Sequence, residues 1–198
     1  MTSLQFVLAS ASPQRKTLLE GVGLSFVVSP PETDESLCTE KDPVRRAIVL
    51  ARTKAEDRAS AFPDSWILGS DTLVVSSAGE LLEKPADAQD ARRMLSLHSG
   101  SCSIVHSTLC LRSPSGECFE GLSTSSVFFK ELTEEEKDWW IRTDQWKDRS
   151  GGFQIDGKGQ FLIAKIEGDW SSIVGLPVFL LGELLSEAGL SIESFRSE

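Results

Sequence analysis

The first twenty residues of the chain constrain its fold more than any other stretch. An apolar run at residues 6–9 predicts a buried strand. Ser12 and Pro13 follow, and they predict a helix that begins directly after the strand, because serine is a good N-cap and proline fits the first helical position. Gly23 is expected to end this helix. The chain therefore opens with a strand, a short turn and a helix.

Two basic residues lie in the first turn of this predicted helix. Arg15 and Lys16 occupy the end of the helix that already carries a partial positive charge. The turn before them contains Ser10 and Ser12, and the helix start offers free backbone N–H groups. These groups together suit a bound anion such as a phosphate. The alternative is a capped surface helix whose two basic side chains face solvent.

Length and charge exclude several classes of protein. With 198 residues the chain forms one domain or two small lobes. Its net charge of −10 argues against broad binding to nucleic acid or to anionic membranes. No apolar run is long enough to span a bilayer, and the start of the chain lacks a signal-peptide pattern, so we expect a cytoplasmic protein. A polyanionic ligand would need a local basic pocket.

The histidines and cysteines do not form a convincing metal site. His98, Cys102, His106 and Cys110 recur every four residues, which on a helix would line one face. Residues 103–111, however, have the pattern of a strand, in which positions four apart are about 13 Å from each other. We therefore interpret these side chains as packing residues. The four cysteines of the chain are expected to be reduced thiols.

Strands and helices alternate along the chain before a hairpin interrupts them. Strands are expected at residues 6–9, 24–28, 66–75, 81–82, 102–112, 118–129 and 160–166. Helices are expected from residues 13, 43, 88, 134 and 177, the second reaching about residue 61. Residues 167–175 are expected to form a loop. This order predicts an α/β protein with a mixed sheet and flanking helices.

Asp71 is out of place in its surroundings. It lies within residues 66–75, which have the composition of a central buried strand, where an unpaired carboxylate is expensive. Either a metal, a cation or a polar cleft compensates the charge, or the strand breaks at Gly69 and Asp71 caps a turn. We favour a functional Asp71. Lys54 adjoins an apolar helix stripe and could reach a cleft along it, and Lys84 lies near the end of the short strand that follows.

Two loops are candidates for ligand contacts. The Pro-broken acidic loop at residues 29–35 contains Asp34 and Glu35, whose oxygens suit Mg²⁺, although the loop could equally be a solvated surface segment. The segment 148–159 contains four glycines, which allow backbone to approach a ligand closely. Its glycine spacing does not match the dinucleotide-binding fingerprint.

Five short motifs, taken together, resemble a known family. They are residues 8–16 (LASASPQRK), 69–72 (GSDT), 83–85 (EKP), 150–153 (SGGF) and 174–177 (VGLP). In order and spacing they are similar to the Maf family, the septum-formation-inhibitor-like nucleotide pyrophosphatases, and the match runs from about Leu4 to Leu190. The resemblance implies one Maf-like domain over residues 1–198. It also implies a fold similar to inosine-triphosphate pyrophosphatases, with an elongated mixed sheet and two lobes around a cleft.

The resemblance also implies a reaction. Members of the family hydrolyse a nucleoside triphosphate to the monophosphate and pyrophosphate with a divalent metal, usually Mg²⁺, and so clear non-canonical or modified nucleotides. By this resemblance Asp71 is the proton acceptor and a metal ligand, and either Asp34 or Glu35 is a second ligand. The residues that match the family's phosphate-binding positions are Ser10, Arg15, Lys16, Lys54 and Lys84.

Three positions leave the preferred base open. Gln14 stands where the dTTP/UTP branch of the family usually has arginine, and Asp156 stands where that branch has glutamine. Thr72 stands where a second branch, acting on methylated GTP and similar bases, usually has glutamine. An acidic residue at position 156 is similar to that second branch. The expected substrate is therefore either a dTTP/UTP-like or a methylated-base nucleotide.

A different class of function competes with the enzyme. The family name allows a nucleotide-binding regulator of cell division without significant catalysis. A pure binder has no need for Asp71, so its presence together with Lys54 and Lys84 favours the enzyme. The expected partner is a small-molecule nucleotide, with no nucleic acid and no membrane, and the oligomeric state is open, with a homodimer as a candidate.

Overall fold

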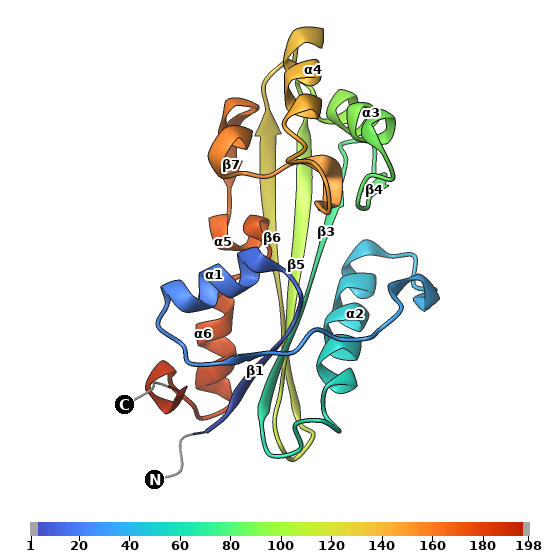
Figure 1. Ribbon diagram of the computed structural model, residues 1–198. Coiled ribbons are helices and arrows are strands. Elements are labelled where there is room, and N and C mark those ends of the chain that lie inside the picture. The colour runs from blue at the N-terminus through green and yellow to red at the C-terminus, as the bar shows by residue number, and fades with distance from the viewer. Residues whose placement is uncertain (1–3, 196–198) are drawn as a thin grey trace. The chain divides into compact units, whose positions relative to one another are not determined.

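The computed structural model describes residues 4–195 and contains a seven-stranded mixed sheet (Figure 1). The strands are β1 (Phe6–Ala9), β2 (Val27–Val28), β3 (Trp66–Val75), β4 (Leu81–Leu82), β5 (Cys102–Arg112), β6 (Cys118–Phe129) and β7 (Ile163–Glu167). The helices are α1 (Pro13–Gly21), α2 (Pro43–Asp57), α3 (Ala88–His98), α4 (Glu134–Arg142), α5 (Trp170–Val174) and α6 (Val178–Glu187). Short 3₁₀ turns occur at Glu35–Leu37, Ser150–Gly152, Gly157–Phe161 and Ile192–Phe195.

The strand order confirms the expected mixed α/β architecture. The sheet runs β2-β1-β3-β5-β6-β7, with β4 paired to β3. β1 is parallel to both β2 and β3, whereas β4 is antiparallel to β3 and β7 is antiparallel to β6. The chain divides into two compact units. Unit 1 comprises the described residues up to Asp71, Ser107–Ser123 and those from Gly175 on, and unit 2 comprises Thr72–His106 and Thr124–Val174.

In unit 1 the sheet is covered on both faces. Val7, Ala9 and Ile67 pack with Ala51 and Ala55 of α2. α1 and α6 lie on the other side of these strands from α2 (Figure 1). The alternate residues of the strands pack with these two helices in a cluster that includes Phe6, Leu8, Leu68, Leu19, Leu181 and Leu184. This alternation is the period of two expected for a strand. Helices on both faces explain why β1 and β3 are apolar almost throughout.

Unit 2 has a separate core that is rich in aromatic residues. Its main contributions come from the end of β3, from α3 and α4, and from the 150–155 loop, and include Val74, Met94, Leu95, Phe129, Trp140, Trp146 and Phe153. The tryptophans of α4 and of the following turn therefore belong to this core or pack against it. A capping box of Thr133 and Glu136 starts α4 at residue 134, where a helix was predicted to begin.

The sequence prediction was wrong at three boundaries and missed one helix. β2 covers only Val27–Val28 because the backbone N–H groups of Leu24 and Ser25 donate to Leu19 and Phe195 rather than to a strand. α2 ends at Asp57, after which single turns replace the helix. β7 begins at Ile163, because residues 157–161 form a 3₁₀ turn. The expected loop at 167–175 contains α5, whose first turn is stabilised by the Asp169 carboxylate, which accepts from Ser171.

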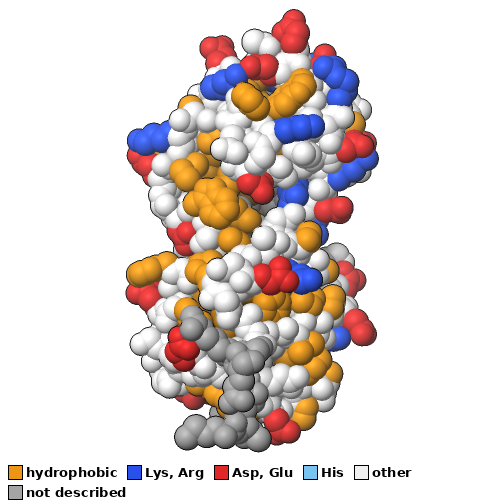
Figure 2. Space-filling model, turned by 60° about the vertical axis from the view of Figure 1, so that its left-hand side comes forward, with side chains coloured by type: hydrophobic (Ala, Val, Ile, Leu, Met, Phe, Trp, Pro, Cys, Tyr) orange, Lys and Arg blue, Asp and Glu red, His pale blue; other side chains and the backbone are white. Residues whose placement is uncertain are grey.

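The surface carries mixed charge. On the face in view, acidic and basic side chains are interspersed (Figure 2). Across the described residues 4–195, none of the helices combines the length and the apolar character needed to cross a membrane.

Candidate active site

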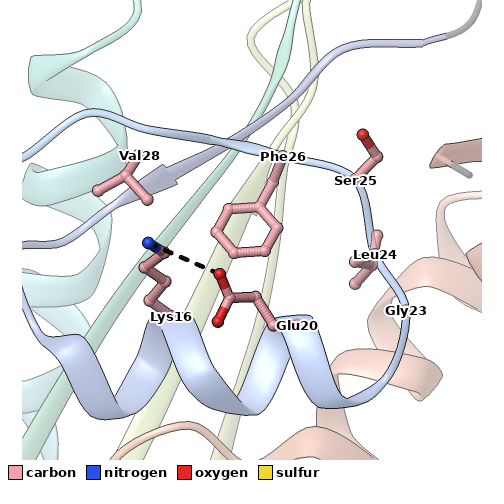
Figure 3. Close-up of a pocket in the computed structure, with 7 residues that line it drawn as sticks. All are labelled: Lys16, Glu20, Gly23, Leu24, Ser25, Phe26 and Val28. Atoms are coloured by element: carbon pink, nitrogen blue, oxygen red, sulfur yellow. Dashed lines mark ion pairs between the residues drawn. The ribbon is translucent and has the colours of Figure 1, made fainter. Parts of the chain in front are cut away.

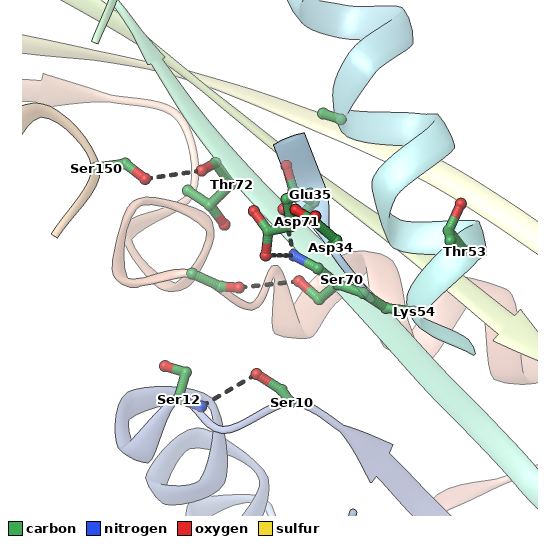
Figure 4. A network of polar contacts seen from close by, with 12 residues as sticks. Ser10, Ser12, Asp34, Glu35, Thr53, Lys54, Ser70, Asp71, Thr72 and Ser150 are labelled. Carbon is green, nitrogen blue, oxygen red and sulfur yellow. Dashed lines mark hydrogen bonds and ion pairs between the residues drawn. The ribbon is translucent and has the colours of Figure 1, made fainter. Parts of the chain in front are cut away.

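A lysine between two carboxylates forms the centre of the candidate site in unit 1. The Nζ atom of Lys54, on α2, lies 2.6 Å from Oδ1 of Asp71 and 2.9 Å from Oε1 of Glu35 (Figure 4). Lys54 and Asp71 are only 6% and 4% exposed, while the Glu35 side chain is about half exposed. The structure thus brings three of the predicted site residues together and supplies the cation that a buried Asp71 requires.

The motif Gly69-Ser70-Asp71 explains how the strand builds this arrangement. Because side chains alternate along a strand, Gly69 and Asp71 share the face that packs on α2. A Cβ atom at Gly69 would lie 2.0 Å from the backbone oxygen of Ala51, so only glycine allows α2 to approach this closely. The close approach brings Lys54, one turn beyond Ala51, over Asp71. β3 continues to Val75, so the alternative of a strand broken at Gly69 is wrong.

Burial controls the ionisation of Asp71. Loss of solvation raises the pKa of the Asp71 carboxyl above its usual range, and nearby Glu35 raises it further, while the positive charges of Lys54 and Arg15 lower it. The two oxygens of this carboxylate differ. Oδ1 accepts from Lys54, whereas Oδ2 is buried and has no hydrogen-bond partner. A buried polar atom without a partner is costly, so Oδ2 is the atom best suited to a ligand.

Arg15 and Ser10 form a second polar cluster in unit 1. The Arg15 guanidinium donates from Nε to the Gly175 carbonyl at 2.8 Å, and from Nη1 to the Ser70 carbonyl at 2.9 Å and to Ser10 Oγ at 3.1 Å. Burial lowers the pKa of the guanidinium, an effect opposed by Asp71 and Glu35. Arg15 therefore ties the start of α1 to β3 and to the loop before α6.

Ser10 has a defined place in this cluster. Its Oγ accepts from the backbone N–H of Ser12 at 3.2 Å (Figure 4). The same oxygen accepts from Arg15. Because both of these contacts use the oxygen as an acceptor, the hydroxyl hydrogen of Ser10 is the group that remains to be donated. Ser12 caps α1 as predicted, by accepting from the Arg15 N–H.

Lys16 has a different environment from Arg15. Its Nζ lies 3.6 Å from Oε1 of Glu20, one turn further along α1, and both side chains are more than half exposed. It lines a pocket of about 620 Å³ beneath the segment that follows α1 (Figure 3). The lining consists of Lys16, Glu20, Gly23, Leu24, Ser25, Phe26 and Val28, and includes neither Lys54 nor Asp71.

Gln14 and Asp34 make local contacts. Gln14 Oε1 accepts from the Ser12 hydroxyl at 3.1 Å. Asp34 Oδ1 accepts from the backbone N–H and the hydroxyl of Ser36, at 3.0 and 2.6 Å, and these bonds lower the pKa of the Asp34 carboxyl. Asp34 thus caps the short turn that contains Glu35, and of the two candidate carboxylates it is Glu35 that contacts Lys54.

Three predicted site residues belong to unit 2. The carbonyl of Thr72 accepts from the Ser150 hydroxyl at 3.2 Å. Lys84 follows Glu83, whose carbonyl accepts from the backbone N–H of Gly151 at 3.0 Å. Asp156 is exposed and its carbonyl accepts from Gln154 Nε2 at 3.2 Å. The Gly-rich loop at 150–152 therefore contacts the segments on which Thr72 and Lys84 lie.

The family model described as "Maf-like protein" matches residues 5–188 of the chain. The chain belongs to the Maf family. The resemblance seen in its five motifs is thereby confirmed.

Curated relatives cover almost the whole of this Maf-family chain. A dTTP/UTP pyrophosphatase from Treponema denticola is 42% identical over 95% of the chain and 98% of its own length. Proteins with the same name from Pyrococcus furiosus and Deinococcus radiodurans are 37% and 40% identical, over 91% and 96% of the chain and 94% and 96% of their own lengths. Among solved structures, a dITP/XTP pyrophosphatase from Mycobacterium abscessus is 15% identical with a TM-score of 0.43, covering 71% of the chain and 95% of its own.

The candidate site of this Maf-family chain offers too few protein ligands for a divalent metal by itself, and it fits such an ion when substrate phosphates supply further ligands. Within residues 4–195 there is no group of three or more His, Cys, Asp or Glu side chains that could hold a metal. Mg²⁺, however, commonly takes one or two carboxylates and fills its other positions with water and substrate phosphates. The unpartnered Oδ2 of Asp71 and the half-exposed carboxylate of Glu35 match that donor set.

Sequence reasoning missed several polar residues around these sites. Ser70 donates to the Gly175 carbonyl at 3.1 Å, on the opposite face of β3 from Asp71. His98, which we interpreted as a packing residue, is buried but also hydrogen-bonded at both ring nitrogens. The alternation of β3 would have placed Ser70, whereas no local signal identifies the partners of His98, since the Gly151 carbonyl lies 53 residues away.

Proposed function

We propose that this chain hydrolyses a nucleoside triphosphate to the nucleoside monophosphate and pyrophosphate, by cleaving the α–β phosphoanhydride. The observation that carries the proposal is Asp71, a buried carboxylate with one oxygen paired to Lys54 and the other without a partner. The curated relatives, at 36–42% identity, are named dTTP/UTP pyrophosphatases, which supports the same reaction.

Asp71 is the proton acceptor in this proposal. Lys54 holds Oδ1, so Oδ2 is the oxygen directed to the attacking water. The raised pKa of the carboxyl makes it a stronger base than an exposed aspartate, because a base is most effective when its pKa approaches the working pH. The water attacks the α-phosphorus, its proton passes to Oδ2, and pyrophosphate leaves with the bonding electrons.

The basic residues stabilise the phosphates and the developing negative charge. We assign this role to Ser10, Arg15, Lys16, Lys54 and Lys84, the residues that match the family's phosphate-binding positions. Preorganised charges supply most of the rate enhancement in phosphoryl transfer. The contacts of Arg15 with three different segments give its guanidinium such preorganisation.

The proposal includes a divalent metal. We propose Mg²⁺, because this ion binds carboxylate and phosphate oxygens. Of the two carboxylates that match its donor set, Glu35 is the one that would hold it, with Asp34 fixing the turn that carries Glu35, so that Oδ2 of Asp71 stays available for the proton. When bound, such an ion supplies charge neutralisation to the phosphate oxygens. Lys54 contacts both Asp71 and Glu35 and contributes a fixed positive charge beside them.

The proposal also covers which nucleobase the substrate carries. The names of the relatives support dTTP and UTP. Asp156, an exposed carboxylate that accepts hydrogen bonds only, favours instead a guanine-like edge with two donors. We take the pyrimidine nucleotides as the first candidates and methylated guanine nucleotides as the second.

A substrate panel tests the proposal. Purified protein with Mg²⁺ is incubated with dTTP, UTP, the remaining canonical triphosphates and 7-methyl-GTP, and phosphate is measured with and without added inorganic pyrophosphatase. The expected signal appears only when pyrophosphatase is added. Direct release of orthophosphate would overturn attack at the α-phosphorus. Binding of nucleotide without turnover of any panel member would favour the regulator instead.

A further inference from the structure

The loop Ser150–Gly152 connects two segments that carry predicted site residues of unit 2. The Ser150 hydroxyl donates to the carbonyl of Thr72, at 3.2 Å. The Gly151 N–H donates to the carbonyl of Glu83, at 3.0 Å. Thr72 follows Asp71 directly in the chain, and Lys84 follows Glu83 directly. The loop therefore contacts the backbone directly before Lys84.

The loop has an unusual backbone that needs support from outside. Gly151 and Gly152 have φ angles of +73° and +68°, in the left-handed region that favours glycine. A Cβ atom at Gly151 would lie 3.0 Å from a side-chain methyl group of Val74, and one at Gly152 would lie 3.1 Å from the ring of Pro85. Two adjacent residues of this kind are conformationally permissive, so other contacts must select their conformation.

His98 is the side chain that holds the centre of the loop. Its Nε2 lies 2.8 Å from the Gly151 carbonyl and its Nδ1 lies 2.7 Å from Ser103 Oγ. A carbonyl only accepts hydrogen bonds, so Nε2 must carry the proton and Nδ1 must accept from the Ser103 hydroxyl. The imidazole is 0% exposed and stacks on Phe129, with ring centroids 4.4 Å apart. A second buried donor, Trp140 Nε1, holds the Gly152 carbonyl at 2.9 Å.

We infer that His98 is a positioning residue for the hydrolysis, acting on Lys84 through Gly151 and Glu83. The inference rests on the proposed function, in which Lys84 binds substrate phosphate. Ser103, His98, Gly151 and Glu83 form one continuous line of hydrogen bonds across unit 2. Fixing both groups of Gly151, its carbonyl by His98 and its N–H by Glu83, selects one loop conformation. A small misplacement of a binding group costs about a hundredfold in rate, so this line is catalytically important.

Substitutions at the two histidines of the chain test this role. His98→Phe fills the same volume without hydrogen bonds, whereas His98→Gln retains a donor for Gly151 and an acceptor for Ser103. We expect kcat/KM for the best panel substrate to fall about tenfold or more in His98→Phe and to stay within about threefold of wild type in His98→Gln. His106 is the matched control, because it is only partly buried and contacts Thr124 on the neighbouring strand, so His106→Phe should stay within about twofold.

A double-mutant cycle identifies the residue through which His98 acts. In a Lys84→Ala background, His98→Phe should reduce kcat/KM by less than about threefold, because the residue that it positions is already gone. An equal loss in both backgrounds would overturn the inference. The imidazole tautomer offers a readout that does not depend on activity, since nitrogen NMR of the wild type should show the proton on Nε2 of His98, and a proton on Nδ1 would contradict the assignment.

Failure of the proposed function and failure of the positioning role give different results. Wild-type protein that releases no pyrophosphate refutes the proposed function, whereas active wild type with a fully active His98→Phe refutes only the positioning role. If His98→Phe does not fold, Ser103→Ala takes its place, since it removes only the donor to Nδ1. Ser103→Ala should lower kcat/KM several-fold while the protein stays folded, which a melting temperature above the assay temperature would show. An unchanged kcat/KM in Ser103→Ala would then overturn the inference.

Discussion

The two units use opposite kinds of polar contact around their predicted site residues. In unit 1, Asp71 is surrounded by charges, with Lys54 and Glu35 in direct contact and Arg15 close enough to affect its pKa. In unit 2, the 150–152 loop is held by neutral groups, an imidazole and an indole that donate to backbone carbonyls. Unit 1 thus holds charged side chains in place around Asp71, whereas unit 2 holds the backbone of a loop in place.

This difference has consequences for stability. Taking charges out of water is costly, and a buried ion pair repays that cost only with good geometry, so the cluster in unit 1 is weak evidence for stability. Neutral hydrogen bonds in a dry core contribute about 1 kcal/mol each, and they cost more when one partner is removed. Substitutions in unit 1 should therefore affect chemistry, and should affect stability strongly only where they leave a buried charge without its partner. Substitutions in the loop of unit 2 should affect geometry and folding together.

The largest expected effect is that of Asp71→Asn. Loss of the proton acceptor should lower kcat by about a thousandfold or more, within the range of general base catalysis. The free energy of unfolding at neutral pH should stay within about 1 kcal/mol of wild type, because the raised pKa means that the ionised carboxylate opposes folding, asparagine still accepts from Lys54, and Lys54 keeps its ion pair with Glu35. Pyrophosphate release and urea unfolding measure the two quantities.

An exposed aspartate close to the start of β3 provides the control for this variant. Asp64→Asn changes the same functional group two residues before β3, outside the core. It should leave both kcat and stability unchanged. An Asp71→Asn protein that keeps more than about a tenth of the wild-type kcat would exclude Asp71 as the proton acceptor.

Lys54→Met should lower the free energy of unfolding much more than Asp71→Asn does. Methionine has a similar length but no charge, so Asp71 would remain buried without its partner and facing Glu35. Breaking a buried pair from one side costs about 3–5 kcal/mol, and we expect a loss of about 3 kcal/mol in the free energy of unfolding. Lys41→Met, at an exposed position, should cost less than about 0.5 kcal/mol. Equal stability of the two variants would show that Lys54 does not compensate Asp71.

The sequence predicted most of the secondary structure because its signals are local. Ser12, Asp42 and Thr133 are N-caps whose bonds lie within four residues, and each helix begins where its cap predicts. The anomaly of Asp71 was visible because one carboxylate interrupts an apolar strand. The partners of Arg15 and His98 could not be predicted, because Gly175 is 160 residues from Arg15 and the sequence pattern does not encode such long-range contacts. α5 was missed although Asp169 offers a local cap, because the helix has only five residues.

The neutral contacts of unit 2 predict how stability depends on pH. Burial lowers the pKa of His98 to about 4, from its usual value near 6.5. Between these values the unfolded chain binds a proton at this histidine and the folded chain does not. Stability contributed by neutral His98 is therefore complete above about pH 6.5 and is lost as the pH falls toward 4, by roughly 3 kcal/mol in total.

Variants of the two histidines separate this effect from other titrations. Urea unfolding of His98→Gln should lack the part of the pH dependence between about pH 6.5 and 4 that belongs to His98, because glutamine does not titrate. His106→Gln should keep it. If wild type and His98→Gln lose stability in parallel over this range, the imidazole of His98 is not held neutral by the core of unit 2.

The smallest expected effect concerns Asp156, which belongs to unit 2 but is exposed and carries a charge. Its carboxylate accepts hydrogen bonds only, so it suits the two adjacent donors of a guanine edge, whereas glutamine offers both a donor and an acceptor and suits uracil or thymine. Asp156→Gln should raise the ratio of kcat/KM for dTTP over that for 7-methyl-GTP by about three- to tenfold, within what one hydrogen bond contributes. Glu131→Gln, another exposed acidic position of unit 2, should leave the ratio unchanged. If the ratio in Asp156→Gln does not move, position 156 does not read the base.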